Sequence, residues 1–408
     1  MSQARGHFEG FADHTLLKHA FIGSYLVQWA SILLSERAGH TEVCFIDCFG
    51  GPGHDGKGQE GSPLIAARTA VAIARMSELG KLPPGRVLRI VAVEQQKKYC
   101  DELRISVQEL LGLDPSRVLV VHADYRDALE SIVSFRGSSP CLTFLDPFGV
   151  SGLDASVFPA FLAGDKSELL LLVSGMGAAR LSGVLSADGH QYDVELEAAE
   201  ASPTLFPEMQ EETAARIRHR REEYIEALDS TKPGAREVLF RALGNDEAVE
   251  RILKSNSAER PMAFVKAIAE LLRKAGALYV VLIPMRDEHG SPKYTLMHAS
   301  KSPRAVSAMK EAVSTGLNRE ELSKEMRERI RRDLTVPTGA YVDWLKAVLA
   351  GSSEYWAWGR KQRRKRSLQE ILVETTALFP FQVVDVKKEL RRRGYLTRRD
   401  NREWVQFP

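Results

Sequence analysis

The chain has 408 residues, which is long enough for two or three domains. Its 56 basic and 54 acidic residues nearly balance, so no overall positive charge marks it as a nucleic-acid-binding protein. The dense basic clusters are concentrated near the C-terminus. No apolar run resembles a signal peptide or approaches the roughly 20 residues of a membrane-spanning helix. We therefore expect a soluble cytoplasmic protein.

The four cysteines indicate neither a disulfide framework nor a metal centre. Cys44, Cys48, Cys100 and Cys141 form no CxxC pair, and few histidines stand near them. We interpret them as reduced thiols in or near the core. The sequence also contains no GxxxxGK[ST], HExxH or GxSxG motif. No bound metal is expected.

Strand-like and helix-like segments alternate through the first half of the chain. Residues 1–12 have no clear pattern, and a helix is expected over residues 14–36. Strands are predicted at residues 43–47, 89–94, 118–122, 141–146 and 168–174, with helices at 62–78 and 95–111 and a short helix after 124. This alternation predicts an α/β fold with a Rossmann-like, doubly wound parallel sheet.

The elements that follow distinguish this sheet from a purely parallel dinucleotide-binding one. A polar, helical insertion near residues 200–260 precedes a helix at 262–274. Strands at 277–285 and 293–299 flank a turn at 287–291, which predicts an antiparallel hairpin at the sheet edge. Such a hairpin is typical of class I methyltransferase sheets. Residues 301–333 read as amphipathic helix, so the first domain is predicted to span residues 1–334.

A second domain is predicted from residue 335 to 408, after the sequence TVPTG. Helices are expected at residues 340–349, 368–378 and 382–393, with a basic connector at 359–367 and two short strands at the end. Three helices followed by a β-ribbon are the order of a winged helix-turn-helix domain.

The stretch VCFIDCFGGPG is the most informative motif. An apolar strand ends at Asp47 and leads directly into Gly50, Gly51 and Gly53. A dinucleotide-binding fingerprint has the opposite order, with glycines first and an acid about 20 residues later. A carboxylate inside the glycine loop suits the cationic amino acid part of S-adenosylmethionine (SAM). The alternative interpretation is a tight turn with a capping acid.

Two further acids end the next strands. Glu94 is expected to hold the ribose hydroxyls, and its alternative is a solvated acid at a strand end. Asp124 is expected to contact the adenine amino group, and its alternative is a helix N-cap. The predicted cofactor site therefore contains Asp47, Phe49, Gly50, Gly51, Gly53, Glu94 and Asp124.

The fourth strand ends in Asp146, Pro147, Phe148 and Gly149, which we predict to form the catalytic tetrapeptide. Amino-methyltransferases carry a D/N-P-P-Y/F tetrapeptide at this place, where an oxygen and a proline carbonyl accept the two N–H groups of the target amine. The sequence DPFG departs from that pattern and resembles the tetrapeptide of the tRNA guanine-N2 dimethyltransferases. The alternative is a strand-ending turn with a packed phenylalanine.

The C-terminal cations are candidates for nucleic-acid contact. They are Arg360, Lys361, Arg363, Arg364, Lys365, Arg366, Arg391, Arg392, Arg393, Arg398 and Arg399. Phosphate binding by clustered cations, with neighbouring tryptophans and tyrosines, suits a nucleic-acid surface. A solvated helix face is the alternative, and winged helices also bind proteins.

Several features together resemble the three-Cys-motif partner family (TcmP). They are a leading helix with Lys18, Tyr25 and Trp29, the sequence FIDCFGGPG followed by GSPL, DPFG, the late hairpin and the winged-helix tail. The resemblance covers nearly the whole chain. It implies a class I SAM-dependent methyltransferase that works with a partner protein containing three cysteines and resembling radical-SAM iron–sulfur enzymes.

Three functions fit these observations. The first is a SAM-dependent methyltransferase acting on an exocyclic amine of RNA or DNA, with a flipped-out target base. The second is a non-catalytic adaptor that binds nucleic acid or protein through a methyltransferase-like fold. The third is a nuclease in which the acids at the strand ends bind Mg²⁺.

Overall fold

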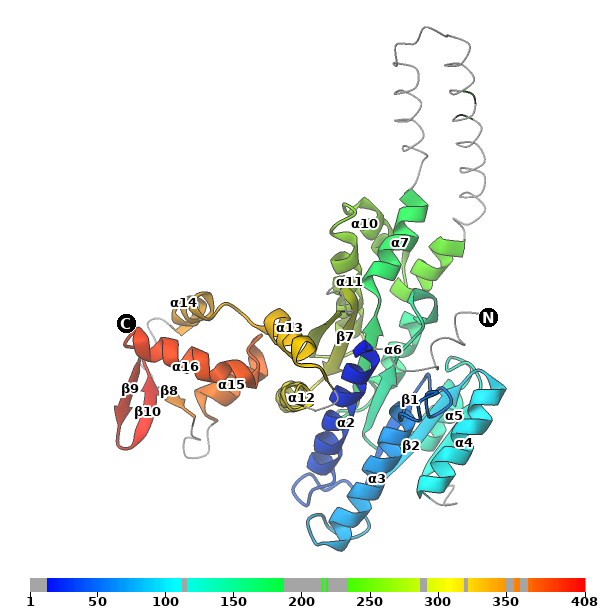
Figure 1. The fold of residues 1–408 in the computed structure, drawn as a ribbon, viewed down its shortest axis with the longest axis horizontal. Coiled ribbons are helices and arrows are strands. Elements are labelled where there is room, and N and C mark those ends of the chain that lie inside the picture. Colours follow the sequence, from blue (N-terminus) through cyan, green and yellow to red (C-terminus); the bar gives the residue numbers. More distant parts are fainter. Residues whose placement is uncertain are drawn as a thin grey trace. The chain divides into compact units, whose positions relative to one another are not determined.

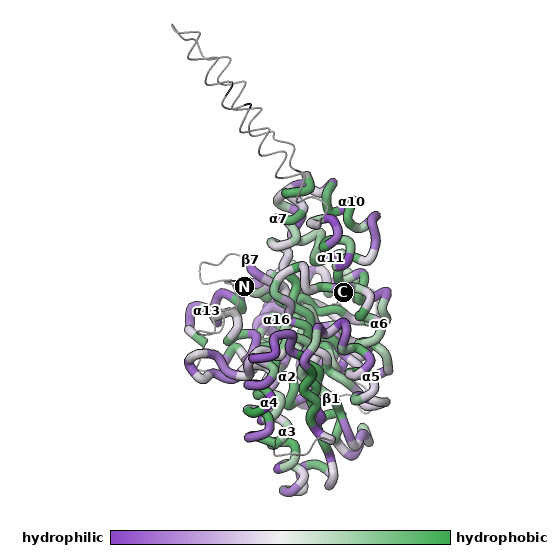
Figure 2. Tube along the Cα trace, turned by 90° about the vertical axis from the view of Figure 1, so that its right-hand side faces the viewer, coloured by the Kyte–Doolittle hydropathy of each residue, from purple (hydrophilic) through white to green (hydrophobic). Residues whose placement is uncertain are grey.

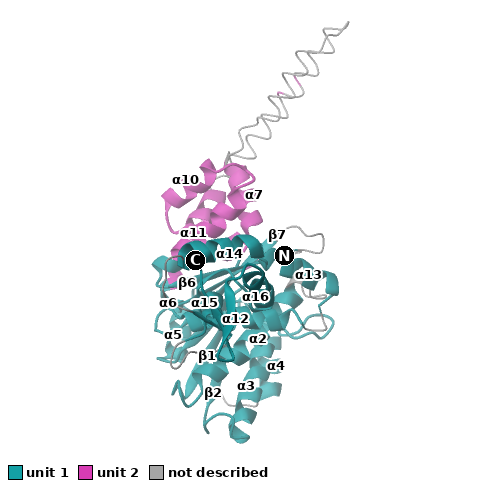
Figure 3. Cartoon of the chain, turned by 90° about the vertical axis from the view of Figure 1, so that its left-hand side faces the viewer, with its two compact units in different colours: residues 1–146, 159–172, 272–408 teal, residues 147–158, 173–271 magenta. Residues whose placement is uncertain are grey.

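The computed structural model describes residues 13–111, 116–186, 215, 218, 234–286, 292–318, 322–349, 356–359 and 366–407. The described chain divides into two compact units (Figure 3). Unit 1 contains residues 1–146, 159–172 and 272–408, and unit 2 contains residues 147–158 and 173–271. The predicted turn at residues 287–291 and most of the predicted insertion lie outside the described residues.

A seven-stranded sheet with the order β3-β2-β1-β4-β5-β7-β6 organises the first unit (Figure 1). Its strands are β1 (Glu42–Asp47), β2 (Val87–Glu94), β3 (Val118–His122), β4 (Cys141–Leu145), β5 (Glu168–Val173), β6 (Tyr279–Arg286) and β7 (Pro292–Ser300). The pairs β1–β2, β2–β3, β1–β4 and β4–β5 are parallel, whereas β6 and β7 form an antiparallel hairpin. The predicted sheet is confirmed, including its antiparallel edge.

Strand β1 is buried except at its first residue, and the residues between its two terminal acids are apolar (Figure 2). Continuous apolar runs of this kind are typical of parallel strands covered on both faces. The helices α2 (Asp13–Leu33), α3 (Ser62–Glu78), α4 (Lys97–Leu111), α5 (Leu129–Arg136), α6 (Phe158–Phe161), α7 (Gly175–Ser186), α10 (Asp246–Lys254) and α11 (Arg260–Lys274) lie between or beside the strands in the sequence. The bounds of α2, α3, α4 and α11 agree with the predicted helices to within a few residues, whereas α6 and α7 were not predicted.

Helix α2 is apolar around most of its circumference, as expected for a buried helix. Phe21, Tyr25 and Leu26 are completely buried, and these side chains belong to the main hydrophobic cluster of the protein. Helix α12 (Pro303–Gly316) packs closely on α2, since a Cβ atom at Gly316 would lie only 2.7 Å from the Phe21 ring. The predicted helix over residues 301–333 is instead two helices, α12 and α13 (Lys324–Leu334).

The C-terminal segment has its own hydrophobic cluster. It contains α14 (Thr338–Leu349), β8 (Trp356–Trp358), α15 (Leu368–Thr375), α16 (Val383–Arg392), β9 (Leu396–Arg399) and β10 (Arg402–Val405). The three strands form an antiparallel sheet of order β8-β10-β9. Asp400 and Asn401 both have positive φ, as in the type I′ turns that join hairpin strands. Strand β8 was not predicted, and the domain boundary near residue 335 and the winged-helix assignment stay predictions.

A buried lysine connects α12 to the C-terminal segment. Lys310 is 2% exposed, and its ammonium group donates hydrogen bonds to the carbonyl oxygens of Val373, at 2.8 Å, and Thr376. These carbonyls belong to the end of α15, where helix carbonyls lack intrahelical partners. Burial lowers the pKa of Lys310 to about 8.

We predict that Lys310 makes stability depend on alkaline pH. Between about pH 8 and the unfolded value near 10.5, the unfolded chain binds the proton that the folded chain has released, so stability rises with pH through this window. The contribution is at most about 3 kcal/mol. Urea unfolding of the wild type and of Lys310→Met at several pH values isolates this contribution. The other titrating groups are present in both proteins, so their effects cancel when the two unfolding free energies are subtracted. A difference in unfolding free energy that stays constant from pH 7.5 to 10 would contradict the assignment.

Candidate functional site

The predicted site acid Asp47 ends β1 in the protein interior. Its side chain is fully buried, and its Oδ1 atom accepts a hydrogen bond from the Phe49 N–H at 3.0 Å. Its Oδ2 atom has no hydrogen-bond partner within the described part of the chain. Buried polar atoms are nearly always paired. Asp47 therefore presents an unsatisfied acceptor at the carboxyl end of the central strand.

The electrostatic state of Asp47 depends on its neighbours. Burial raises the pKa of Asp47 to about 6, and the Asp146 carboxylate contributes to the rise. The Ser62 hydroxyl, the Phe49 amide and the Lys18 ammonium favour the ionised form and limit the rise in pKa. The carboxylate is thus largely ionised at neutral pH but close to protonation. A cation or hydrogen-bond donor beside Oδ2 would stabilise its charge.

The glycine loop after Asp47 is hydrogen-bonded to the end of β2. The Gly50 N–H donates to the Val93 carbonyl at 2.8 Å, and the Gly51 N–H donates to Glu94 Oε2 at 2.9 Å. Gly51 and Gly53 have φ values of 63° and 91°, which favour glycine. At Gly50 a Cβ atom would lie 2.8 Å from Leu103 Cδ2. Packing against Leu103 therefore favours glycine at the first position of the loop.

Glu94 anchors this loop. Its Oε2 accepts from Gly51, and its Oε1 accepts from the Gln96 N–H at 2.6 Å. Burial raises the pKa of Glu94, while these backbone N–H groups oppose the rise. Both carboxylate oxygens are thus engaged with the backbone, a role that the sequence did not reveal. Because each oxygen has two lone pairs, both retain acceptor capacity for a ligand.

Asp124 pairs with its near neighbour Arg126. Its Oδ1 accepts from Arg126 Nε at 2.8 Å and its Oδ2 accepts from Nη2 at 2.6 Å. The N-cap of α5 is Ala128, so Asp124 does not cap that helix. Between them, Tyr125 is buried and packs on the Phe49 ring with 5.2 Å between centroids. The loops after β1 and β3, which carry two groups of predicted site residues, are thereby in direct contact.

Asp146, the acid of the predicted catalytic tetrapeptide, forms an ion pair with Lys18 of α2. The Lys18 side chain is 7% exposed and that of Asp146 is 23% exposed. Lys18 also lies 5.7 Å from the centre of the Phe144 ring. Since Asp146 and Lys18 both influence the pKa of Asp47, these three groups form one charge cluster at the carboxyl edge of the sheet.

The other tetrapeptide residues form a tight turn. The Gly149 N–H donates to the Pro147 carbonyl at 2.8 Å, and Gly149 has a φ of 89°. Pro147 is buried, whereas Phe148 is 61% exposed. Residues 147–149 belong to unit 2 and Asp146 belongs to unit 1. Their catalytic role stays a prediction.

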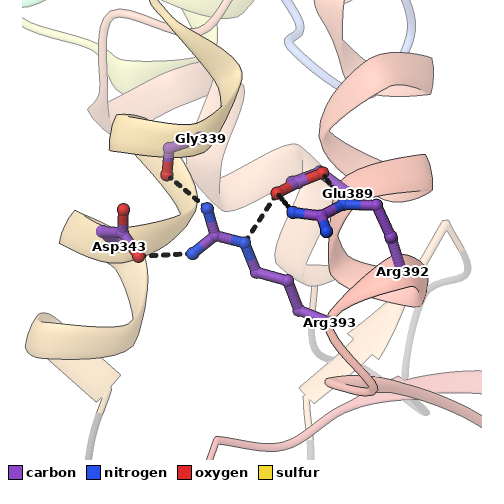
Figure 4. A network of polar contacts seen from close by, with 5 residues as sticks. All are labelled: Gly339, Asp343, Glu389, Arg392 and Arg393. Carbon is purple, nitrogen blue, oxygen red and sulfur yellow. Dashed lines mark hydrogen bonds and ion pairs between the residues drawn. The ribbon is translucent and has the colours of Figure 1, made fainter.

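Several predicted nucleic-acid-binding arginines form ion pairs within the C-terminal segment. Arg392 and Arg393 both bind Glu389, and Arg393 also contacts Asp343 and the Gly339 carbonyl (Figure 4). The two guanidinium groups lower the pKa of Glu389 to about 2. Arg393 therefore links α14 to α16.

The remaining predicted cations differ in their surroundings. Arg391 pairs with Glu403 at 2.9 Å, and Arg366 pairs with Glu374. Arg398 and Arg399 are exposed on β9. The predicted contacts Arg360, Lys361, Arg363, Arg364 and Lys365 lie outside the described residues.

Unit 1 also contains a buried triad of Tyr25, Glu168 and His298 that the sequence did not reveal. Glu168 Oε2 accepts hydrogen bonds from the Tyr25 hydroxyl and from His298 Nε2, the latter at 2.7 Å. Tyr25 and His298 also stack edge to face, with 5.1 Å between ring centroids. The available signal was an acid at the first position of the otherwise apolar strand ELLLLV.

The cysteines, the potential metal ligands and the apolar helices were also subjects of sequence-based expectations. All four cysteines are free and buried, as predicted. Within the described ranges, no group of three or more His, Cys, Asp or Glu side chains is arranged to hold a metal ion. The described helices include none that is long and apolar enough to cross a membrane.

Comparisons with known proteins give distant structural likenesses. No protein family profile and no curated protein sequence match the chain. The O-methyltransferase TomG from Streptomyces achromogenes, solved with SAM, aligns with a TM-score of 0.31 and 12% identity over 74% of this chain and 96% of its own. The DszA carbon methyltransferase aligns with a TM-score of 0.28 and 13% identity over 64% of this chain and 48% of its own.

The strand order decides the fold, because the TM-scores are too low to do so. In the order β3-β2-β1-β4-β5-β7-β6, strand β7 lies between β5 and the edge strand β6, and it pairs antiparallel with β6. The chain has a methyltransferase-like Rossmann fold. In such folds, ligands bind outside the carboxyl ends of the strands, where the charge cluster around Asp47 lies. Membership of the TcmP family stays a prediction.

We predict that Gly50→Ala destabilises this methyltransferase-like fold by about 1 to 3 kcal/mol, because the new methyl group overpacks against Leu103. A Leu103→Ala background should remove most of this penalty. Gly183→Ala is a matched control, since a Cβ atom there meets nothing within 4 Å in helix α7. Urea unfolding is measured for the wild type, Gly50→Ala, Leu103→Ala, the double variant and Gly183→Ala. Equal stability of Gly50→Ala and the wild type would contradict the packing argument.

Proposed function

We propose that the protein is a SAM-dependent methyltransferase whose cofactor binds at the carboxyl edge of the sheet. The observation that carries this proposal is the unpartnered Oδ2 atom of the fully buried Asp47, beside a glycine loop that is tied to Glu94. A buried carboxylate in this state fits a ligand that brings positive charge and N–H donors. The amino acid part of SAM has both.

The other residues at this edge suit the remaining parts of the cofactor. Glu94 would accept from the ribose hydroxyls through lone pairs that Gly51 and Gln96 do not use. Asp124 would share its carboxylate between Arg126 and the adenine amino group. When bound, SAM supplies an electrophilic methyl group on a sulfonium.

The chain's own contribution to catalysis would be mainly orientation. Asp146 would accept an N–H hydrogen bond from the target amine. Lys18 would hold the Asp146 carboxylate in place, and its positive charge would offset the repulsion between Asp146 and Asp47. Correct alignment of two reactants is worth up to about 7–11 kcal/mol in favourable systems. Pro147, Phe148 and Gly149 would complete the binding of the target.

We further propose that the target is an exocyclic amine of RNA or DNA. Exposed Arg391, Arg392, Arg398 and Arg399 would contact phosphates, although the first two also pair with Glu403 and Glu389. The resemblance to the TcmP family implies cooperation with a three-Cys-motif, radical-SAM-like partner. Total nucleic acid is therefore the first substrate to test.

One observation favours the alternative of a non-catalytic adaptor. The carboxylate proposed to receive the target is already paired with the nearly buried ammonium of Lys18. If Lys18 never yields that position to a substrate amine, the fold binds without transferring methyl groups. The two functions differ in whether the wild-type protein transfers methyl groups from SAM.

We predict that Asp47→Asn weakens SAM binding by roughly 10- to 100-fold, as expected for loss of a hydrogen bond to a charged group. Asparagine keeps the acceptor for the Phe49 N–H, so the loop should stay folded. Isothermal titration calorimetry measures the effect, with the exposed Glu78→Gln on α3 as the control. Wild-type affinity in Asp47→Asn would refute the site.

The wild-type affinity for SAM should also fall as the pH drops through about 6. Below its pKa, Asp47 is protonated and no longer attracts a cation. Asp47→Asn should show no such step. Lys18→Met should move the step to higher pH, because the Lys18 ammonium lowers the pKa of Asp47.

We predict that Asp146→Ala retains SAM binding but loses most transfer of tritiated methyl groups to total nucleic acid. Alanine removes both the acceptor for the target amine and the partner of Lys18. Circular dichroism and thermal unfolding check that the variant is folded. An unchanged rate would eliminate the proposed role of Asp146, and SAM binding without any transfer by the wild type would favour the adaptor.

A further inference from the structure

A cavity lies at the opposite edge of the sheet from Asp47. Asp47 is the last residue of β1, whereas Glu168, which lines this cavity, is the first residue of the strand β5 that runs in the same direction. The cavity has a volume of about 440 Å³, within the range of small-molecule sites. The end of α2, the end of β7 and the start of α12 also line it.

Its polar floor is held by the buried triad described above. The Glu168 carboxylate accepts hydrogen bonds from the Tyr25 hydroxyl and from His298. Burial, followed by the influence of Glu168, raises the pKa of Tyr25 well above its usual value, which keeps the hydroxyl protonated as a donor. The Tyr25 hydroxyl and the Glu168 carboxylate of the floor are therefore held by hydrogen bonds within the protein, while His298 Nδ1 has no hydrogen-bond partner among the described residues.

One wall of the cavity is apolar. Trp29 and Leu33 of α2 and Ala308 of α12 line it and are buried. Ile32 lines it too but is 52% exposed, an unusual exposure for a large apolar side chain on an otherwise buried helix. An apolar ligand body that covered Ile32 would gain roughly 25 cal/mol for each Å² removed from water.

Three cations from three separate segments surround the mouth. Arg37 follows α2, Lys166 precedes β5, and Arg304 belongs to the first turn of α12. All three are exposed, and none has an ion-pair partner among the side chains that the structure describes. Asp165 is the exposed acid of the lining. Cations gathered at an apolar cavity concentrate positive potential there.

We infer that this cavity binds a small organic anion with a flat apolar body. The body would pack on Trp29, Ile32 and Leu33, and its carboxylate, sulfonate or phosphate would meet Arg37, Lys166 and Arg304. This site is separate from the proposed cofactor site and does not rest on the proposed function. A cation such as SAM is disfavoured here by the charge of the mouth.

The test uses two probes that share a ring system. 1-Anilinonaphthalene-8-sulfonate carries the anion, and N-phenyl-1-naphthylamine is its uncharged counterpart. Fluorescence titration of the full chain should give saturable sulfonate binding that is at least tenfold weaker in Arg37→Gln/Arg304→Gln. Ile32→Glu, which places a negative charge on the exposed wall, should weaken it as well. The neutral probe should bind the wild type and the double variant equally.

Lys266→Gln is the matched control, since this exposed lysine of α11 loses the same charge away from the cavity. It should bind the sulfonate like the wild type, and thermal unfolding should show that all variants are folded. Saturating SAM should leave sulfonate binding unchanged. Absence of sulfonate binding, wild-type affinity in the double variant, or displacement by SAM would each overturn the inference.

Discussion

The removal of the Asp47 carboxylate from water is the constraint on which the carboxyl edge of the sheet depends. Asp47 is fully buried, and its neighbours must compensate the charge that burial disfavours. The Phe49 amide, Ser62 and Lys18 do so in part, while Asp146 acts against them. The Phe49 amide and the position of Lys18 thus offset part of the cost of burying this acid, and the open acceptor at Oδ2 leaves part of that cost uncompensated.

Helix α2 joins this edge of the sheet to the other. Lys18 reaches the charge cluster at the carboxyl edge, Tyr25 reaches Glu168, and Trp29 lines the cavity at the amino edge. Each of these groups has a polar atom on a helix whose other buried side chains are mostly apolar. The helix therefore contributes polar contacts to two separate regions while it fills the main core. Lys18, Tyr25 and Trp29 are also the residues of this helix that resemble the TcmP family.

The sequence predicted what depends on local patterns and missed what depends on distant pairing. Apolar runs ending in acids placed β1, β2 and β4 correctly, because a buried parallel strand leaves a clear signature. The ion pair between Lys18 and Asp146 joins residues 128 apart, and the contact between Glu168 and His298 joins residues 130 apart. No spacing rule reveals such pairs. Strand β8 was missed because its three residues are too few to show alternation.

Helix α12 carries contacts in several directions within a few turns. Arg304 lies at the cavity, Lys310 holds the carbonyls at the end of α15, and Gly316 allows close approach to Phe21. In an α-helix each residue turns the following side chains by about 100°. A single inserted or deleted residue between these positions would rotate one set of contacts away from its partners while leaving the other in place. Length variation among natural relatives should therefore be found in the segments on either side of this helix and be absent within it.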